Sequence, residues 1–99
     1  MKTLPLSRLQ AREAHVEAFK ALAHLSRLQV FFFLVRTGRE VPVGEIGAEL
    51  EIPGPTLSHH LDVLRRAGLV SSRKAERFVY YSVRPETVSE LVRLLTACC

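Results

Sequence analysis

Apolar residues recur at helical spacing along most of the chain, and the first such stretch is residues 7–25. Its apolar positions are Leu9, Val16, Phe19, Leu22 and Ala23. Residues 26–38 are more continuously apolar, and their aromatic, β-branched centre is compatible with a buried strand. We favour a buried helix, because Ser26 can cap its start and Gly38 can end it at a helical length.

Two further helices, separated by a tight break, are predicted in the middle of the chain. Residues 43–52 place apolar side chains three and four positions apart, which predicts a short amphipathic helix. The tripeptide "PGP" then interrupts the chain, and the following "TLSHHLDVLRRAGLV" carries leucines at i, i+4 and i+7. Gly54 suits the N-cap of this helix, Pro55 its first turn and Gly68 its C-terminal end. Two helices joined in this way predict a helix-turn-helix.

After the fourth helix the hydrophobic period changes to two, as in strands. The β-prone runs "LVSSR" and "RFVYYSV" are joined by the charged turn "KAE", which predicts a hairpin with Arg73, Lys74 and Arg77 at its tip. Residues 85–99 return to helical spacing, with an apolar stripe that a single chain would leave uncovered. We therefore predict one domain over residues 1–99, mainly α with a small β-hairpin. Its element order, α-α-α-α-β-β-α, is that of a winged helix-turn-helix.

The composition, with 47% apolar and 24% charged residues, is typical of a soluble globular domain. The longest uninterrupted apolar run has six residues, whereas a membrane-spanning helix needs roughly 20. The N-terminal residues lack the pattern of a secretory signal, and two adjacent cysteines cannot staple the fold, so we expect a cytoplasmic protein. A domain this small leaves apolar helix faces for a second copy to cover, which favours a homodimer.

Positive charge is concentrated in one segment. Residues 65–84 contain six bases and a single acid, Glu76, whereas the whole chain has a formal net charge of +4. Residues 40–51 are the reverse, with four glutamates and no base. A basic stripe is typical of a protein that binds a polyanion such as nucleic acid, and a solvated charged face is the competing interpretation.

The predicted elements suit double-stranded DNA, because a helix fits the major groove and a basic β-tip can contact the phosphates beside it. Residues 56–70, "TLSHHLDVLRRAGLV", closely resemble the recognition-helix signature of the ArsR-type (ArsR/SmtB) metalloregulatory repressors, and residues 21–30, "ALAHLSRLQV", resemble an earlier motif of that family. The resemblance implies a homodimeric repressor that places two recognition helices about 34 Å apart on an inverted-repeat operator. It also implies a dimer interface between the first and last helices. The residues expected there are Val16, Phe19, Val88, Leu91, Val92 and Leu95.

The resemblance assigns DNA contacts residue by residue to the fourth helix and the wing. The expected contacts are Thr56, Ser58 and His59, with Arg65 and Arg66 as weaker phosphate candidates and Arg73, Lys74 and Arg77 on the wing. The chain departs from the family at two points. Pro53 and Gly54 stand where a capping serine and a polar base-reading residue are usual, and the wing tip lacks glycine, which predicts a wider loop.

The stretch "SHHLD" brings a serine, two histidines and an aspartate together in sequence, which are the residue types of a hydrolase triad. Neighbouring residues on a helix point to different sides, so a nucleophile, a base and an acid cannot converge there, and we expect no enzyme. For the same reason the adjacent histidines are not expected to form a metal site. We expect His60 to face inward with a hydrogen bond, and His15 and His24 to have structural roles.

The only cysteines, Cys98 and Cys99, are the candidate sensor. The Cys-x-Cys motif that many relatives carry before the recognition helix is absent, and the last helix lacks a histidine for the zinc site of other relatives. The resemblance to an arsenic-responsive branch with a vicinal cysteine pair implies As(III) or Sb(III) as inducer, and soft thiolates suit such ions. A three-sulfur site needs another cysteine, so we expect either that the natural chain continues past Cys99 or that two sulfurs suffice.

Two other functions remain compatible with the sequence. A repressor of the same fold could respond to oxidation or persulfide formation, although a disulfide between adjacent cysteines would be strained. A winged-helix module could instead bind a partner protein through its apolar last helix. DNA binding would weaken steeply with added salt, whereas a largely apolar protein interface would not. The terminal thiols could also have no sensory role.

Overall fold

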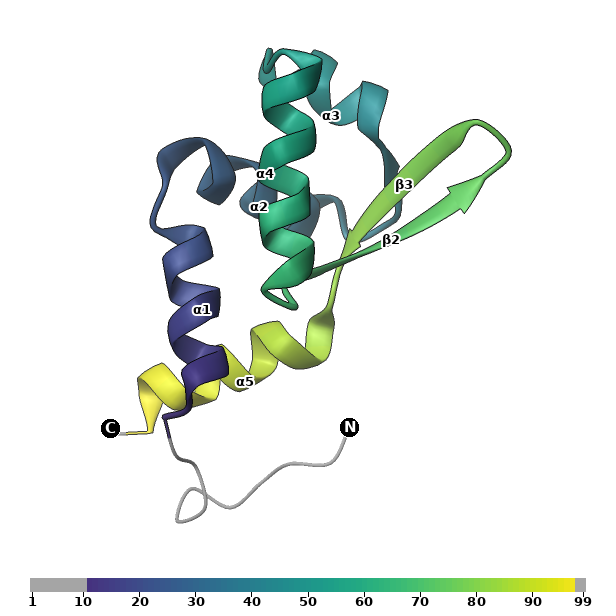
Figure 1. Ribbon diagram of the computed structural model, residues 1–99. Helices are drawn as coiled ribbons and strands as arrows, with labels where there is room; N and C mark the ends of the chain where they lie inside the picture. The colour runs from purple at the N-terminus through teal and green to yellow at the C-terminus, as the bar shows by residue number, and fades with distance from the viewer. Residues whose placement is uncertain (1–10, 98–99) are drawn as a thin grey trace.

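The computed structural model describes residues 11–97, and residues 1–10 and 98–99 lie outside the described part. Its elements are α1 (Glu13–Leu22), α2 (Leu25–Thr37), β1 (Val41–Pro42), α3 (Val43–Leu50), α4 (Gly54–Arg66), β2 (Val70–Ala75), β3 (Phe78–Val83) and α5 (Pro85–Thr96). The helix-turn-helix and its projecting hairpin, the wing, form the winged helix-turn-helix that the sequence predicts (Figure 1). The first helix is shorter than the predicted range 7–25, of which residues 7–10 are not described.

The apolar segment after α1 is a helix, as predicted, and not a strand. It begins at Leu25 with His24 as its N-cap, so Ser26 lies in the first turn rather than at the cap. Gly38 ends α2 in the left-handed conformation, with φ of 62°, and its N–H donates to the Leu34 carbonyl at 3.1 Å. Among residues 11–97, no single helix is long and apolar enough to cross a membrane; α1 and α2 would suffice only together, and they are bent by 100° at their break.

The sheet has three antiparallel strands in the order β1-β3-β2, where only a two-stranded hairpin was predicted. β1 is two residues long and ends at Pro42, which has no N–H to donate and is tolerated at such a sheet edge. Ala75 pairs with Phe78, which leaves a turn of two residues, Glu76 and Arg77. The predicted wider loop is therefore wrong, because Glu76 itself adopts the left-handed conformation, with φ of 57°, that a glycine would ordinarily supply.

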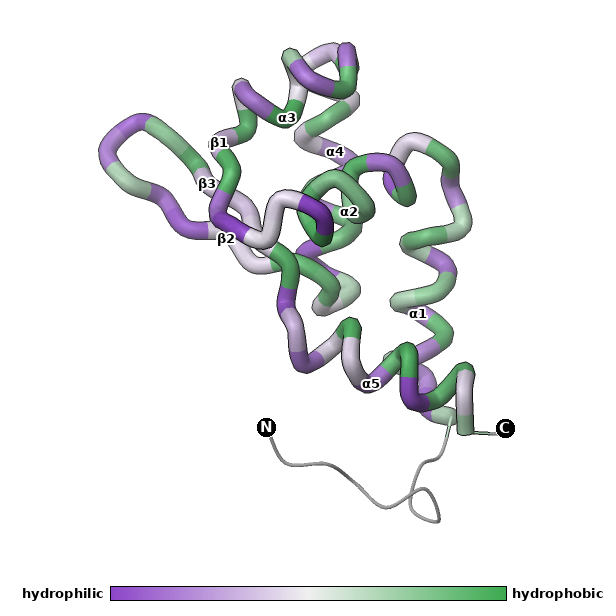
Figure 2. Tube along the Cα trace, turned by 180° about the vertical axis from the view of Figure 1, so that it is seen from behind, coloured by the Kyte–Doolittle hydropathy of each residue, from purple (hydrophilic) through white to green (hydrophobic). Residues whose placement is uncertain are grey.

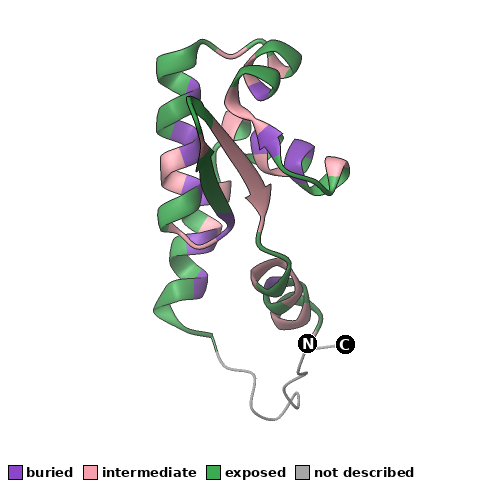
Figure 3. Ribbon diagram, turned by 90° about the vertical axis from the view of Figure 1, so that its right-hand side faces the viewer, coloured by how far each residue is buried: buried purple, intermediate pink, exposed green. Residues whose placement is uncertain are grey.

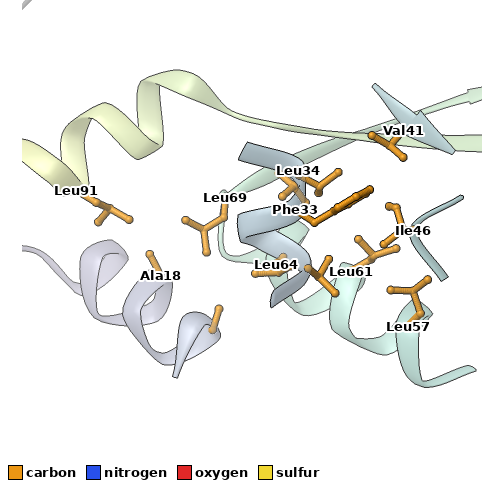
Figure 4. Packing of buried hydrophobic residues seen from close by; sticks show 13 residues of the cluster. Ala18, Phe33, Leu34, Val41, Ile46, Leu57, Leu61, Leu64, Leu69 and Leu91 are labelled. Atoms are coloured by element: carbon orange, nitrogen blue, oxygen red, sulfur yellow. The ribbon is translucent and has the colours of Figure 1, made fainter. Parts of the chain in front are cut away.

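The hydrophobic core lies where α2, α3 and α4 meet the base of the wing. The three leucines that the helical pattern places on one side of α4 are at most 1% exposed. The fully buried residues include Val30, Leu34, Val41, Ile46, Leu57, Leu61, Leu64, Leu69 and Val70. α5 joins this cluster through Leu91, which lies beside Ala18 of α1 at one end of it (Figure 4). In Figure 3 the buried residues of α1 and α4 face the rest of the molecule, and the outer side of both helices is exposed.

The C-terminal end of α4 depends on Gly68, as predicted. The helix ends at Arg66, and Gly68 follows in the left-handed region with φ of 80°. The Gly68 N–H donates to the Arg65 carbonyl, and the Leu69 N–H donates to the Leu64 carbonyl, both at 3.0 Å. This pair of bonds is a Schellman motif, which satisfies the last carbonyls of the helix and turns the chain into β2.

Candidate nucleic-acid interface

α3 and α4 are joined by a tight turn, and α3 approaches α4 closely at Gly47. Glu51 ends α3 in the left-handed conformation, and the Ile52 N–H donates to the Gly47 carbonyl at 3.2 Å. A Cβ added to Gly47 would lie 3.3 Å from Cδ2 of Leu57, so a side chain there would press against α4. The close approach of the two helices fixes how α4 is presented to solvent.

α4 buries one face and presents the opposite face to solvent. All five α4 residues expected to contact DNA are exposed: Thr56, Ser58, His59, Arg65 and Arg66. The N-cap is Pro53, and Gly54, predicted as the cap, occupies the first helical position. No side chain caps this end, so N–H groups of the first turn meet solvent at the positive end of the helix dipole, where a phosphate is favoured.

The two arginines at the end of α4 share one acid. Asp62 accepts from Arg65 at 2.7 Å and from Arg66 at 2.8 Å. The hydrogen bond from Arg65 is the main reason that the pKa of Asp62 is lowered, and the charges of both arginines add to it. These pairs are exposed, so they cost little to open, and either arginine can exchange Asp62 for a phosphate.

The wing carries its charges differently from the prediction. Arg73 lies within β2, away from the turn, and donates through Nε and one Nη to the carboxylate of Glu40, at 2.8 and 2.9 Å. It also lies over the ring of Tyr80, 5.0 Å from the ring centre, and its bond lowers the pKa of Glu40. Arg73 is thus not at the tip and is already paired. An acidic residue from the loop before β1 holds it, a contact that sequence spacing does not reveal.

Two predicted wing residues do lie near the turn. Lys74 is on β2 and Arg77 is in the turn itself, and both are exposed. Neither makes an ion pair with any residue in the range 11–97. Arg77 lies over the ring of Phe78, 5.5 Å from its centre, and that ring is half exposed. The outer wing therefore offers two cations, and Figure 2 shows its tip as hydrophilic.

The adjacent histidines of α4 differ in exposure, as the prediction of different sides implies, although their ring centres are only 5.9 Å apart. His59 is exposed, whereas His60 is 5% exposed and faces inward. The expected hydrogen bond is absent: within the described residues, Nδ1 of His60 is buried and has no hydrogen-bond partner. The ring of His24 is 4.8 Å away between centres, and burial, followed by the charges of His24, Arg27 and His59, lowers the pKa of His60.

His15 has the structural role expected of it. The ring is buried in α1, and its Nδ1 accepts from the Arg12 backbone N–H at 2.9 Å. Its Nε2 therefore carries the proton and donates to the Glu90 carboxylate of α5. This bond ties the two terminal helices together. Within residues 11–97, no three His, Cys, Asp or Glu side chains lie close enough together to hold a metal ion.

The terminal helices carry the residues expected at a dimer interface. Val16, Val92 and Leu95 are 43, 53 and 62% exposed, whereas Leu91 is 6% exposed and already packs within its own chain. Phe19 and Val88 are half-buried. α2 also has an exposed apolar stripe that the prediction of a buried helix missed; it comprises Leu25, Leu28, Phe32 and Val35. The sensor candidates Cys98 and Cys99 lie outside the described residues.

The chain is similar to known regulators over most of its length. A family model described as a helix-turn-helix domain matches residues 22–73. The biofilm growth-associated repressor of Agrobacterium fabrum is 36% identical over 95% of this chain and 80% of its own.

Two solved structures extend this similarity to three dimensions. One is a possible transcriptional regulator for arsenical resistance, 32% identical over 80% of each chain, with a TM-score of 0.70. The other is a homodimeric winged helix-turn-helix DNA-binding domain from Mycobacterium bovis, a possible ArsR-family regulator. It is 29% identical over 87% of this chain and 78% of that one, with a TM-score of 0.71.

Proposed function

Because this chain belongs to the ArsR-type family of winged helix-turn-helix transcriptional regulators, we propose that it is a repressor that binds an inverted-repeat operator as a homodimer. In this proposal As(III) or Sb(III), bound through Cys98 and Cys99, releases it from DNA. The observation that carries the DNA-binding part is the exposed polar face of α4, standing directly beside a wing whose outer cations are unpaired among the described residues (Figure 1).

Each element has a distinct task on DNA. In this proposal α4 enters the major groove, and the exposed Thr56, Ser58 and His59 near its N-terminus contact base edges or phosphates. Lys74 and Arg77 at the outer wing contact the phosphates alongside. Phosphate contacts fix the register of the protein on the duplex, and contacts to base edges select the sequence.

The homodimer is supported by the uncovered apolar side chains of α1 and α5. Val16 and Val92 are roughly half exposed. A second copy of the chain would bury this apolar area, which stabilises the dimer. The similar structure from Mycobacterium bovis is homodimeric by its own description. A two-fold dimer matches the two-fold symmetry of an inverted repeat, so each α4 meets an equivalent half-site.

The inducer is supported by chemistry and by one relative. Adjacent thiols are soft donors that suit trivalent arsenic or antimony, whereas zinc needs a fuller set of ligands. A similar structure is described as a possible regulator for arsenical resistance. A tenfold loss of DNA affinity corresponds to about 1.4 kcal/mol of coupling, so a small shift between the dimer helices is sufficient.

The test is binding of the reduced protein to a labelled inverted repeat from upstream of its own gene, titrated with arsenite. We expect arsenite to dissociate the wild type and to leave Cys98→Ser with Cys99→Ser bound. If both stay bound, the arsenic part of the proposal is wrong, and the same assay with peroxide or polysulfide tests a thiol-based switch. If binding is absent or insensitive to salt, the DNA-binding part is wrong, and a protein-interaction module becomes the better reading.

A further inference from the structure

A cleft of about 310 Å³ lies beside α4, between the ends of α1 and α4 and the start of α2. We call it the α1–α4 cleft. It is on the side of α4 away from the wing: in Figure 1 the wing projects to the right of α4, and α1 lies to the left. The charged side chains that line it are Glu17 and Lys20 of α1, Arg27 of α2 and Arg66 of α4.

The cleft is predominantly cationic, with three bases around one acid. Lys20 is 3.7 Å from Glu17, at the long end of an ion pair, and both side chains are mostly exposed. Arg27 is held in place because its Nε donates to the Ala21 carbonyl at 2.7 Å, across the junction of α1 and α2. The remaining N–H groups of Arg27 are left for another acceptor.

A helix seated in a major groove has phosphates on both flanks, because the groove is about 12 Å wide and is walled by the two strands. The wing can reach only one of those walls. The α1–α4 cleft lies on the opposite flank of α4, where Arg66 continues the exposed face of the helix into it. Lys20 and Arg27 fall outside the basic segment 65–84, so the distribution of charge along the chain does not point to them.

We propose that the α1–α4 cleft binds operator phosphates on the side of the major groove opposite the wing, with Lys20, Arg27 and Arg66 as the contacts. α4 is then held between two sets of contacts to the DNA phosphates, one on each flank of the helix. This inference rests on the proposed DNA-binding function. Glu17, the one acid in the cleft, opposes the contact and sets its strength.

Two pairs of variants test the cleft, and the two members of each pair change the net charge of the protein by the same amount. Lys20→Gln removes a cation from the cleft, and Arg36→Gln removes one from a separate hollow between α2 and α3. Glu17→Gln and Glu49→Gln remove an acid from the same two places. Arg27 is left unchanged, because its bond to Ala21 supports the α1–α2 junction.

The readout is the dissociation constant for operator DNA as a function of salt concentration. One lost phosphate contact lowers the magnitude of the salt slope by about 0.9 and, extrapolated from 1 M, weakens binding about fivefold at 0.15 M salt. We expect this from Lys20→Gln and not from Arg36→Gln. Glu17→Gln should tighten binding relative to Glu49→Gln, a gain that misfolding cannot produce.

The results separate this inference from the function on which it rests. If the wild type binds operator with a steep salt slope but Lys20→Gln matches Arg36→Gln, and Glu17→Gln matches Glu49→Gln, the cleft proposal alone is overturned. If the wild type binds no DNA at low salt, both fail. Saturable binding of inorganic phosphate that Lys20→Gln abolishes, with unchanged DNA affinity, would mark a small-anion pocket and also overturn the proposal.

Discussion

The helix-turn-helix and the pair of terminal helices differ in how fully their own chain covers them. Leu57, Leu61 and Leu64 of α4 are at most 1% exposed, whereas Val16 of α1 and Val92 of α5 are 43 and 53% exposed. The DNA-reading unit is therefore complete within one chain. The terminal helices, by contrast, keep apolar area that only another surface can bury. Fold and assembly are thus encoded in separate parts of the molecule, and they should fail separately.

The largest effect is expected from a cavity in the core beneath the helix-turn-helix. Leu61→Ala removes a side chain that is fully buried under α4, and we expect it to lower the free energy of unfolding by about 2 to 5 kcal/mol. Denaturant unfolding measures this. Leu95→Ala, at a position 62% exposed, is the matched control and should cost far less under conditions that keep the protein monomeric. Equal losses would mean that the two halves do not differ.

The second test disrupts the apolar surface of the terminal helices. Val92→Glu places a charge on the exposed stripe of α5, and we expect it to raise the dissociation constant of the dimer by at least about tenfold, because the charge would have to be desolvated. Analytical ultracentrifugation measures this, and circular dichroism should show an unchanged helical content. Gln29→Glu, an equal change of charge on an exposed position of α2, should leave the dimer intact. A dimer that survives Val92→Glu would place the interface elsewhere.

Sequence reasoning succeeded where local pattern and tertiary burial agree. The leucine spacing of α4 and the two ends marked by Gly38 and Gly68 follow from helical periodicity and from the left-handed conformation that glycine favours. The N-caps of α2 and α4 lie two residues and one residue before the predicted positions, respectively. His24 and Pro53 cap these helices without a side-chain bond, so no capping residue marks them in the sequence.

What could not be predicted depends on contacts between distant residues. β1 is too short to show a period, and it forms only because β3 lies beside it. Arg73 and Glu40 are far apart in sequence and meet only once the sheet has formed. The sequence predicts a buried α2 and misses its exposed stripe, because a continuous apolar run does not show which of its sides the core will cover.

A third test concerns the one buried side-chain nitrogen of the described residues that lacks a partner. The pKa of His60 is lowered, so between that pKa and about 6.5 the unfolded chain binds a proton that the folded chain does not. Stability should be unaffected by His60 above this range and should fall as the pH drops through it, by at most about 1.4 kcal/mol per pH unit. Denaturant unfolding at several pH values measures this.

The pH dependence should belong to the buried ring and not to its exposed neighbour. His60→Gln has no proton to gain, so its stability should fall less than that of the wild type between pH 7 and pH 5. His59→Gln retains His60 and should follow the wild type. Parallel curves for the wild type and His60→Gln would show that the ring is protonated as easily when folded as when unfolded. The ring of His60 would then not be tightly packed between α4 and the start of α2.

The smallest effect is expected at the wing. An exposed ion pair, and not apolar packing, joins Arg73 of the wing to Glu40 in the loop before β1. Glu40→Gln removes the carboxylate that Arg73 holds and leaves an arginine free to meet a phosphate. Solvent screens an exposed ion pair strongly, so stability should change little, while the salt slope of DNA binding should steepen by up to about 0.9. Glu49→Gln, the same change on α3, should leave that slope as it was. An unchanged slope for Glu40→Gln would mean that Arg73 stays against Tyr80 and serves the wing rather than the DNA.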